Sequence, residues 1–281
     1  MSVISSRDIG EAVRSAIGIA ATSLRADVRS AIERAAVSES SARGREVLSQ
    51  MLENAAIAER DGVPLCQDTG TTWVWVELGL EERLGSDLAA AVDEAVRTAY
   101  REGALRMSVV RDAIFDRRNT GDNTPAFLDV TLRPGTGATV HVMLKGGGSD
   151  NASVVRMLEP SAGIEGVRRL VLDTVSAKGA SACPPLVVGV GAGGTFDSVG
   201  KLAKKALLRE VGSAPQDELA ASLEAALLAD VNALGIGPAG LGGATTALAV
   251  HVVTAPCHIA ALPVAVNLGC SSLRTVTVEI G

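Results

Sequence analysis

The spacing of apolar residues predicts that the first part of the chain is helical. Between residues 6 and 60, apolar side chains recur every three or four positions, which gives a helix one apolar face. Three such stretches are found, with Ile9, Val13, Ala16 and Ile17, then Leu24, Val28, Ile32 and Ala35, then Val47, Leu48, Met51, Leu52 and Ala55. The sequence Asp-Gly-Val-Pro at 61–64 closes this region with turn residues. We therefore expect a helical lead over about residues 1–62.

Strand-like and helix-like stretches alternate through the rest of the chain. The expected strands are 73–76, 126–133, 138–145, 186–190, 245–254, 262–268 and 275–280. The expected helices are 87–102, 164–178, 196–210 and 216–234. The Pro-Gly-Thr-Gly turn at 134–137 predicts a hairpin between its two flanking strands. We expect an α/β (mixed α+β) fold over residues 1–281, with a helical N-terminal lobe packed on a mixed β-sheet core with flanking helices.

The composition limits which residues can form the core and which classes of partner the chain can bind. Hydrophobic residues make up 47% of the 281 residues but aromatic residues only 2%, so the core must be built from Ala, Val, Leu and Ile. The net charge of −6 argues against a nucleic acid held through its phosphates. It is compatible with a small anionic substrate, because a local cluster of Arg and Lys can outweigh the global charge.

One long segment without charged residues resembles a membrane span. Residues 247–270 contain no Asp, Glu, Lys or Arg. They do contain His251, His258, Pro256 and Pro263 among many β-branched residues, which favours two buried strands joined by a loop. The N-terminus lacks the features of a secretory signal. We expect a cytoplasmic protein that does not associate with membranes.

Three cysteines stand at the edges of strand-like runs. They are Cys66, Cys183 and Cys270, and four cysteines in all are too few for a disulfide scaffold. They could be buried thiols that act as small hydrophobes. Structural zinc sites usually show paired ligands a few residues apart, and these three show no such pair. Three thiolates from distant segments could instead hold three irons of a four-iron cluster and leave the fourth iron open to a substrate oxygen.

Long motifs around these cysteines carry a resemblance to a known family. They are Cys-Gln-Asp-Thr-Gly at 66–70, Lys-Gly-Gly-Gly-Ser at 145–149, Cys-Pro-Pro at 183–185, Gly-Pro-Ala-Gly-Leu-Gly-Gly at 237–243 and Cys-Ser-Ser-Leu-Arg at 270–274. In this order the chain resembles the class I (iron–sulfur) fumarases and, equally, the alpha subunit of L(+)-tartrate dehydratase. The resemblance implies a hydro-lyase with a [4Fe-4S] cluster on Cys66, Cys183 and Cys270. It also implies a separate beta subunit in a heterotetramer, because the chain ends soon after Cys270, the third proposed ligand.

The same resemblance suggests the catalytic residues. Asp68 lies two residues after a proposed ligand, and His258 occupies the position of the family's active-site histidine. A carboxylate paired with an imidazole could relay a proton to a departing hydroxyl, although a lone histidine is more often structural. Cys257 stands where the family usually has an arginine. We interpret it as a non-ligand, because a fourth thiolate would close the open iron.

Substrate binding is assigned to a second group of residues. Arg106 matches the family's substrate-carboxylate arginine, and a guanidinium binds a carboxylate in a two-pronged way that lysine does not match. Without that context, a surface arginine is the simpler interpretation. The glycines at 146–148 follow a strand and precede an expected helix start, so their N–H groups could face an anion. The predicted substrate-binding residues are Gln67, Arg106, Lys145, Gly146, Gly147 and Arg274.

Two further glycine-rich segments lack nucleotide-binding signatures. Residues 191–194 do not form the dinucleotide motif, and 235–243 lack the Walker lysine, so we expect tight loops packed near the cluster. The sequence thus predicts reversible dehydration of a small hydroxy-dicarboxylate, either fumarate/L-malate or L-tartrate/oxaloacetate. The alternative is a non-catalytic iron–sulfur or zinc-binding module for redox sensing or assembly. That module would not need Asp68, His258 and Arg106 near its metal.

Overall fold

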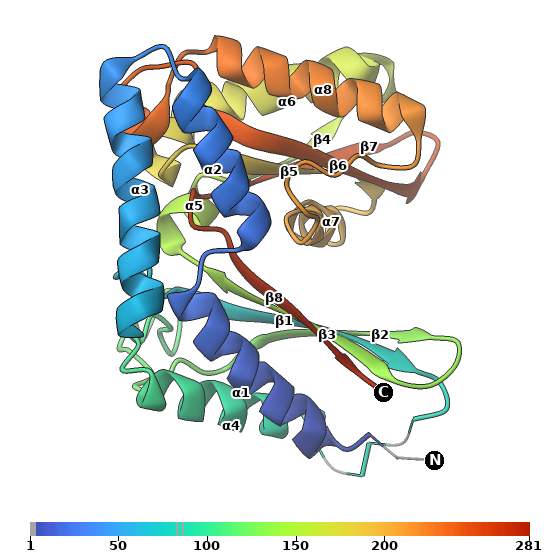
Figure 1. Ribbon diagram of the computed structural model, residues 1–281. Coiled ribbons are helices and arrows are strands. Elements are labelled where there is room, and N and C mark those ends of the chain that lie inside the picture. Colours follow the sequence, from blue (N-terminus) through green and yellow to red (C-terminus); the bar gives the residue numbers. More distant parts are fainter. Residues whose placement is uncertain (1–3, 83, 86) are drawn as a thin grey trace. The chain divides into compact units, whose positions relative to one another are not determined.

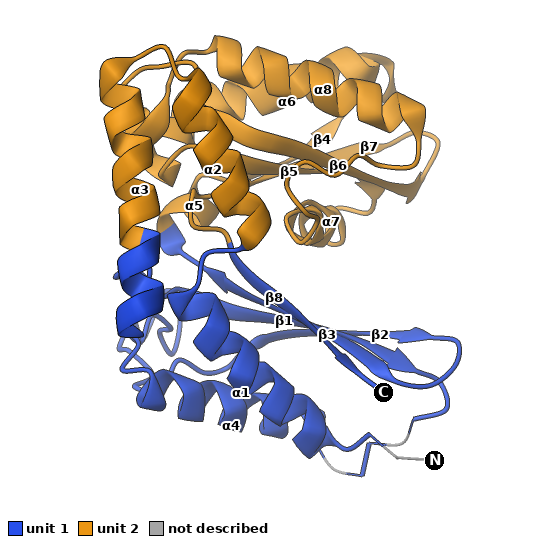
Figure 2. Ribbon diagram, viewed as in Figure 1, with its two compact units in different colours: residues 1–25, 55–147, 274–281 blue, residues 26–54, 148–273 orange. Residues whose placement is uncertain are grey.

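The chain forms two compact units, each built on a four-stranded sheet. The computed structural model describes residues 4–82, 84–85 and 87–281. Unit 1 comprises residues 1–25, 55–147 and 274–281, and unit 2 comprises 26–54 and 148–273 (Figure 2). Helices pack on a sheet in each unit, so the predicted α/β (mixed α+β) class is confirmed.

Unit 1 has the strand order β2-β1-β3-β8. These strands are β1 (Thr71–Gly79), β2 (Phe127–Arg133), β3 (Ala138–Lys145) and β8 (Arg274–Ile280). The helices α1 (Ser6–Thr22) and α4 (Leu88–Glu102) lie on one face of this sheet (Figure 1). The buried core between them consists mainly of Ile, Val, Ala and Leu, as the composition predicts.

The predicted hairpin around 134–137 is wrong, because β1 lies between its two strands. β1 pairs in parallel with β2 and antiparallel with β3. The turn crosses the end of β1, where the Gly79 N–H donates to the carbonyl of Gly137 at 2.8 Å. A Cβ at Gly79 would lie 2.4 Å from the carbonyl oxygen of Gly135, so the crossing requires glycine. The sequence predicts the turn at 134–137, but the insertion of β1 between β2 and β3 depends on pairing with a strand that is distant in sequence.

Unit 2 has the strand order β4-β7-β5-β6. The strands are β4 (Val154–Leu158), β5 (Leu186–Gly194), β6 (Ala247–Cys257) and β7 (Leu262–Gly269). The helices α6 (Gly163–Lys178) and α8 (Glu218–Ala233) lie on one face, and α7 (Val199–Ala206) lies on the other (Figure 1). The uncharged segment 247–270 thus contains two strands, as predicted, with β5 between them.

The glycines of β5 serve helix packing. A Cβ at Gly189 would lie 2.1 Å from the carbonyl oxygen of Ala203, and one at Gly191 would lie 2.7 Å from that of Val199. Both contacts are with the backbone of α7, so these glycines let the helix approach the sheet closely. Residues 191–194 belong to the end of this strand and are not the tight loop that we expected.

The helical lead is confirmed as helices but is divided between the two units. It contains α1, α2 (Ala26–Ser38) and α3 (Ala42–Asp61), and the unit boundaries fall after Arg25 and Asn54. Glu39, which follows α2, is buried and accepts hydrogen bonds from the N–H groups of Ala244 and Thr245 in unit 2. The lead therefore forms no lobe of its own. The assignment of residues 1–281 to one functional domain stays a prediction.

Short helical turns complete the described chain. They are α5 (Gly147–Asn151), η1 (Pro160–Ala162), η2 (Gly179–Ala182) and η3 (Pro238–Gly240). The η3 turn lies in the glycine-rich segment 235–243, and a Cβ at Gly243 would lie 2.8 Å from Oε1 of Glu39. This segment therefore wraps closely around a buried carboxylate.

One described segment, Glu218–Gly240, is long and apolar enough to cross a membrane by length and composition alone. Two of its acidic side chains are paired with arginines of unit 2, Glu224 with Arg209 and Asp230 with Arg168. Such pairing is typical of a helix that packs inside a folded unit. The expected absence of membrane association stays a prediction.

Asp122 fixes the loop between α4 and β2. One carboxylate oxygen accepts from Nε of Arg97 at 3.1 Å, and the other accepts from the N–H and hydroxyl of Thr124 at 3.1 and 2.8 Å. Partial burial alone would raise the pKa of Asp122, but these hydrogen bonds outweigh it and lower the pKa from 3.8 to about 2.

We expect Asp122→Asn to lower the free energy of unfolding by about 1–2 kcal/mol at pH 7. Because the folded-state pKa of about 2 lies below the ordinary 3.8, this stabilisation is present above pH 3.8 and is lost as the pH falls through 2. Urea titrations at neutral and acidic pH measure it, with exposed Glu53→Gln as the control. A difference between wild type and Asp122→Asn that persists below pH 2 would contradict this assignment.

Candidate functional site

Asp68 joins three segments of unit 1 that carry predicted site residues. It lies on the loop between α3 and β1, and its Oδ2 accepts from the N–H of Gly147 at 2.8 Å. Its Oδ1 accepts from Nη2 of Arg106 at 3.3 Å. The Arg106 side chain is 58% exposed and can still reach a ligand. The structure thus brings together Asp68, Arg106 and Gly147, which the sequence proposed from separate motifs.

Arg274 lies near Gly146, as Asp68 does, and is almost fully buried. It begins β8 and is 3% exposed, yet its Nε and Nη1 have no hydrogen-bond partner among the described residues. Its Nη2 is 3.5 Å from the point that a Cβ on Gly146 would occupy, and Oδ2 of Asp68 is 3.2 Å from that point. Arg106 pairs with Asp68, and Arg274 lies near the same glycine as Asp68, so two guanidinium groups and one carboxylate surround Gly146 and the excess positive charge suits an anionic ligand.

Gly70 sets the close approach of the two loops. Its φ is +80°, and a Cβ there would lie 2.4 Å from the carbonyl oxygen of Lys145. Lys145 itself is buried, and strand alternation places its side chain on the opposite face of β3 from Leu144, the register partner of Arg274. The predicted role of Lys145 in substrate binding stays a prediction.

The glycine run at 146–148 differs from the expected anion site. The helix that follows, α5, has only five residues, so its helix dipole is small. The Gly147 N–H that was expected to face a ligand is hydrogen-bonded to Asp68. Gly146 contributes to the site mainly because it has no side chain, so the space beside Asp68 and Arg274 is not filled by a Cβ.

Cys66 and Gln67 lie on the Asp68 loop in unit 1. The thiol Sγ of Cys66 is 3.4 Å from Oε1 of Gln67, and the Gln67 side chain is exposed. Cys66 therefore lies two residues from the Asp68 centre. The role of Gln67 in substrate binding stays a prediction.

The segments that carry Cys183 and Cys270 lie side by side in unit 2. The N–H of Ser271 donates to the carbonyl of Cys183 at 3.0 Å, and neighbouring β5 and β7 pair Val187 with Gly269. Cys183 adopts the left-handed conformation with φ of 57°. None of the four cysteines, all of which the structure describes, forms a disulfide.

Neighbouring segments in unit 2 thus carry two of the three cysteines that were predicted to hold a cluster. The convergence of Cys66 from unit 1 with the pair stays a prediction. The described residues contain no group of three or more His, Cys, Asp or Glu side chains that could hold a metal ion.

His258 does not lie beside the cysteine pair of its own unit. It is exposed in the loop between β6 and β7, whereas Cys270 follows the far end of β7 (Leu262–Gly269). A strand of this length separates the two by about 25 Å. The residues between His258 and Cys270 run along an extended strand, so the two lie at opposite ends of β7. Its catalytic role stays a prediction.

Sequence reasoning missed the buried residues that support the site loops. The hydroxyl of Tyr100 donates to the carbonyls of Gly70 at 2.9 Å and Thr69 at 3.2 Å, and burial raises its pKa. The amide of Asn123 contacts the same loop. Tyr100 is the single tyrosine of the chain, and Asn123 lies in Asn-Thr-Gly-Asp-Asn at 119–123, which were the available signals.

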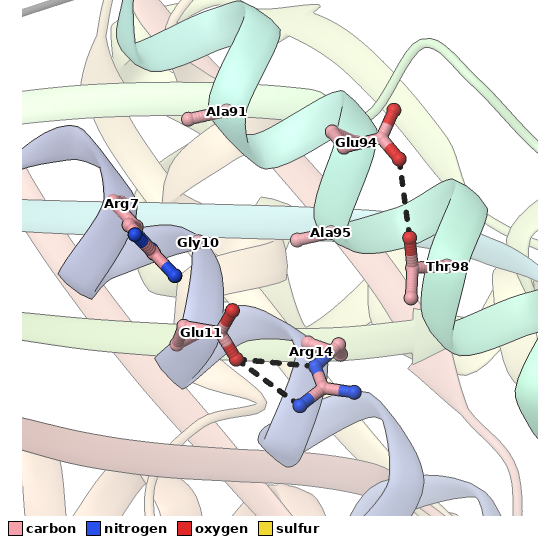
Figure 3. Close-up of a pocket in the computed structure, with 8 residues that line it drawn as sticks. All are labelled: Arg7, Gly10, Glu11, Arg14, Ala91, Glu94, Ala95 and Thr98. Atoms are coloured by element: carbon pink, nitrogen blue, oxygen red, sulfur yellow. Dashed lines mark hydrogen bonds and ion pairs between the residues drawn. The ribbon is translucent and has the colours of Figure 1, made fainter.

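A separate groove of about 480 Å³ lies between α1 and α4 of unit 1 (Figure 3). None of the predicted site residues lines it, and its charged residues Glu11, Arg14 and Glu94 bond to one another or to neighbours. Arg14 pairs with Glu11 at 3.2 Å, and the hydroxyl of Thr98 donates to Glu94 at 3.2 Å. The groove lacks the charge excess found around Asp68.

Comparison with known proteins identifies the family of this chain. The family model described as fumarate hydratase (Fumerase) matches residues 10–279. The chain is 41% identical over 259 residues to the "Putative L(+)-tartrate dehydratase subunit alpha" of Methanocaldococcus jannaschii, which covers 89% of this chain and 90% of the relative. It is 35% identical over 246 residues to the "L(+)-tartrate dehydratase subunit alpha" of Escherichia coli K12, covering 86% and 80%. The chain therefore belongs to the fumarate hydratase family and is a hydro-lyase.

Proposed function

We propose that this chain is the alpha subunit of an iron–sulfur-dependent hydro-lyase that reversibly dehydrates a small hydroxy-dicarboxylate. The observation that carries the proposal is Arg274, a buried guanidinium with two unpartnered nitrogens beside Asp68 and Gly146. Burying such a group without a partner is unfavourable, so a bound carboxylate would complete its hydrogen bonds. Exposed Arg106 offers a second guanidinium at the other side of Asp68.

L(+)-tartrate, dehydrated to oxaloacetate, is the substrate favoured by the names of the two relatives. L-malate, dehydrated to fumarate, is the second candidate, because the family model carries the name fumarate hydratase. The two substrates differ by one hydroxyl group. Their two carboxylates suit the two arginines equally well.

Cys66, Cys183 and Cys270 would hold a [4Fe-4S] cluster, which supplies a Lewis acid for the substrate hydroxyl when it is bound. The backbone hydrogen bond from Ser271 to Cys183 supports this by holding the segments of two of these cysteines together. Cys257 lies at the far end of β7 from that pair, so it is a poor fourth ligand.

The chain's own residues would bind the substrate and move a proton. Arg106 and Arg274 would bind carboxylate oxygens, and the space above Gly146 would admit the substrate. Asp68 would carry the proton that leaves with the hydroxyl. Nδ1 of His258 accepts from the N–H of Ala260 at 3.1 Å, so in the neutral ring the proton sits on Nε2. At about 25 Å from Cys270, His258 would not reach a substrate bound beside that cysteine of the same chain.

A separate beta subunit would supply the remaining groups, including the base that removes the C3 proton. The word alpha in both relatives' names supports such a partner. Four thiols that form no disulfide suit a reducing, cytoplasmic compartment. The alternative hypothesis, a non-catalytic metal-binding module, does not explain why Arg106, Arg274 and Asp68 lie near Gly146.

Anaerobic reconstitution with iron and sulfide, with and without the beta subunit, tests the proposal. The expected result is a cluster seen by visible and EPR spectroscopy, with dehydration of L(+)-tartrate or L-malate by the assembled enzyme. A reconstituted, assembled enzyme that dehydrates neither acid would overturn the proposed activity.

The cysteine assignment is tested by four serine variants. Cys66→Ser, Cys183→Ser and Cys270→Ser should each abolish the cluster spectrum, because a serine hydroxyl is a poor ligand for it. Cys257→Ser is the matched control and should retain the spectrum. Loss of the cluster in that control, or its retention in any of the other three, would contradict the ligand set.

Arg106 should act on substrate and contribute little to stability. Arg106→Lys keeps the charge but loses the two-pronged geometry, so kcat/KM should fall roughly tenfold to a thousandfold in the assembled enzyme. The cluster spectrum and Tm should stay unchanged, and Arg118→Lys, on another exposed arginine, is the control. Unchanged activity per cluster would show Arg106 to be a surface residue.

Arg274 should bind substrate at some cost in stability. Arg274→Met removes a buried, incompletely bonded charge at similar volume, so the free energy of unfolding should stay equal or rise. The same variant should lower kcat/KM roughly tenfold to a thousandfold. Urea unfolding and steady-state kinetics measure the two effects, with Arg14→Met on α1 as the control. A destabilised variant with full activity would indicate a structural arginine.

A further inference from the structure

We propose that Asn123 is a positioning residue for the hydro-lyase site, because its buried amide latches the loop that carries Asp68 to the loop that carries Arg106. The inference rests on the proposed function and adds to it a residue that touches neither substrate nor cluster. Asn123 is fully buried, and each half of its amide is bonded to a different loop.

Hydrogen bonds join the two loops at several described positions. Nδ2 of Asn123 donates to the carbonyl of Gly70 at 3.2 Å, and its Oδ1 accepts from the N–H of Ser108 at 2.6 Å. Beside this bridge, the hydroxyl of Thr69 donates to the carbonyl of Arg106 at 2.7 Å. Gly70 lies two residues after Asp68, and Ser108 lies two residues after Arg106. A shift of either bridge would therefore change the distance between the two charged side chains.

The backbone around Asn123 holds the amide in place. Asn123 has a φ of +60°, a left-handed conformation that asparagine tolerates better than most residues. The preceding Asp122 is anchored to Arg97 of α4, and Asn119 donates from Nδ2 to the carbonyl of Met107 at 2.8 Å. The segment 119–123 thus lies along the Arg106 loop and is fastened to α4 at one end.

The chemistry explains why an asparagine suits this position. One short side chain must bond a carbonyl and an N–H at once, and the asparagine amide carries an N–H donor and a carbonyl acceptor side by side on separate atoms. Aspartate could accept from Ser108 but would turn a second oxygen towards the carbonyl of Gly70. Glycine could adopt the left-handed backbone but would leave both partners unbonded.

Amide hydrogen exchange on the isolated chain gives the first test. In Asn123→Gly the N–H of Ser108 should exchange at least tenfold faster than in wild type, and in Asn123→Asp it should stay protected. Asn232→Ala is the matched control: Asn232 also bridges two segments, accepting from Thr246 and Ala247 in unit 2. Unchanged exchange at Ser108 in Asn123→Gly would overturn the latch, whatever the enzyme does.

Kinetics of the reconstituted, assembled enzyme give the second test. Asn123→Gly should lower kcat/KM for L(+)-tartrate or L-malate about tenfold to a hundredfold, at a temperature where the variant is fully folded. Arg106→Lys should cost at least fivefold less in the Asn123→Gly background than in wild type, because the guanidinium is already misplaced. Additive losses, or a variant that loses only Tm, would reduce Asn123 to a structural residue. A wild-type enzyme without turnover would count against the proposed function, while fast exchange at Ser108 would still support the latch.

Discussion

The carboxylate of Asp68 is the contact on which the unit 1 site depends. It accepts from the backbone of Gly147 and from the side chain of Arg106, so one side chain ties together segments that are far apart in the chain. An ionised acceptor strengthens both hydrogen bonds. Without it, two arginines would stand near one another with no compensating charge, and the loops would lose their common anchor.

Close backbone approach is the second constraint, and glycine meets it in both units. Gly70 lets the Asp68 loop lie against the end of β3, and Gly79 lets the turn of β2 and β3 cross the end of β1. In unit 2, Gly189 and Gly191 let α7 lie directly on β5. The absence of a Cβ at these glycines lets backbone segments pack closely, so it shapes the sites as much as the side chains do.

Unit 1 keeps an arginine that its own fold does not satisfy. Arg274 is buried with two nitrogens unpartnered among the described residues, while other buried charges such as Glu39 are fully hydrogen-bonded by backbone N–H groups. The contrast separates a carboxylate that holds a loop in place from a guanidinium that is kept for a ligand. Full hydrogen bonding of Glu39 thus favours stability, whereas the incomplete hydrogen bonding of Arg274 favours ligand binding at the expense of stability.

The sequence by itself determined the local elements and the identity of the chemical groups. Apolar periodicity is a local property, so the helices of the lead and the strands of 247–270 were predictable, and the motifs around Cys66, Cys183 and Cys270 identified the family. Tertiary structure decided which strands are neighbours. It inserted β1 into a predicted hairpin, divided the helical lead between two units, and placed His258 at the opposite end of β7 from Cys270. It also revealed Asn123 and the unpartnered Arg274, because hydrogen bonding and burial depend on residues that are distant in sequence.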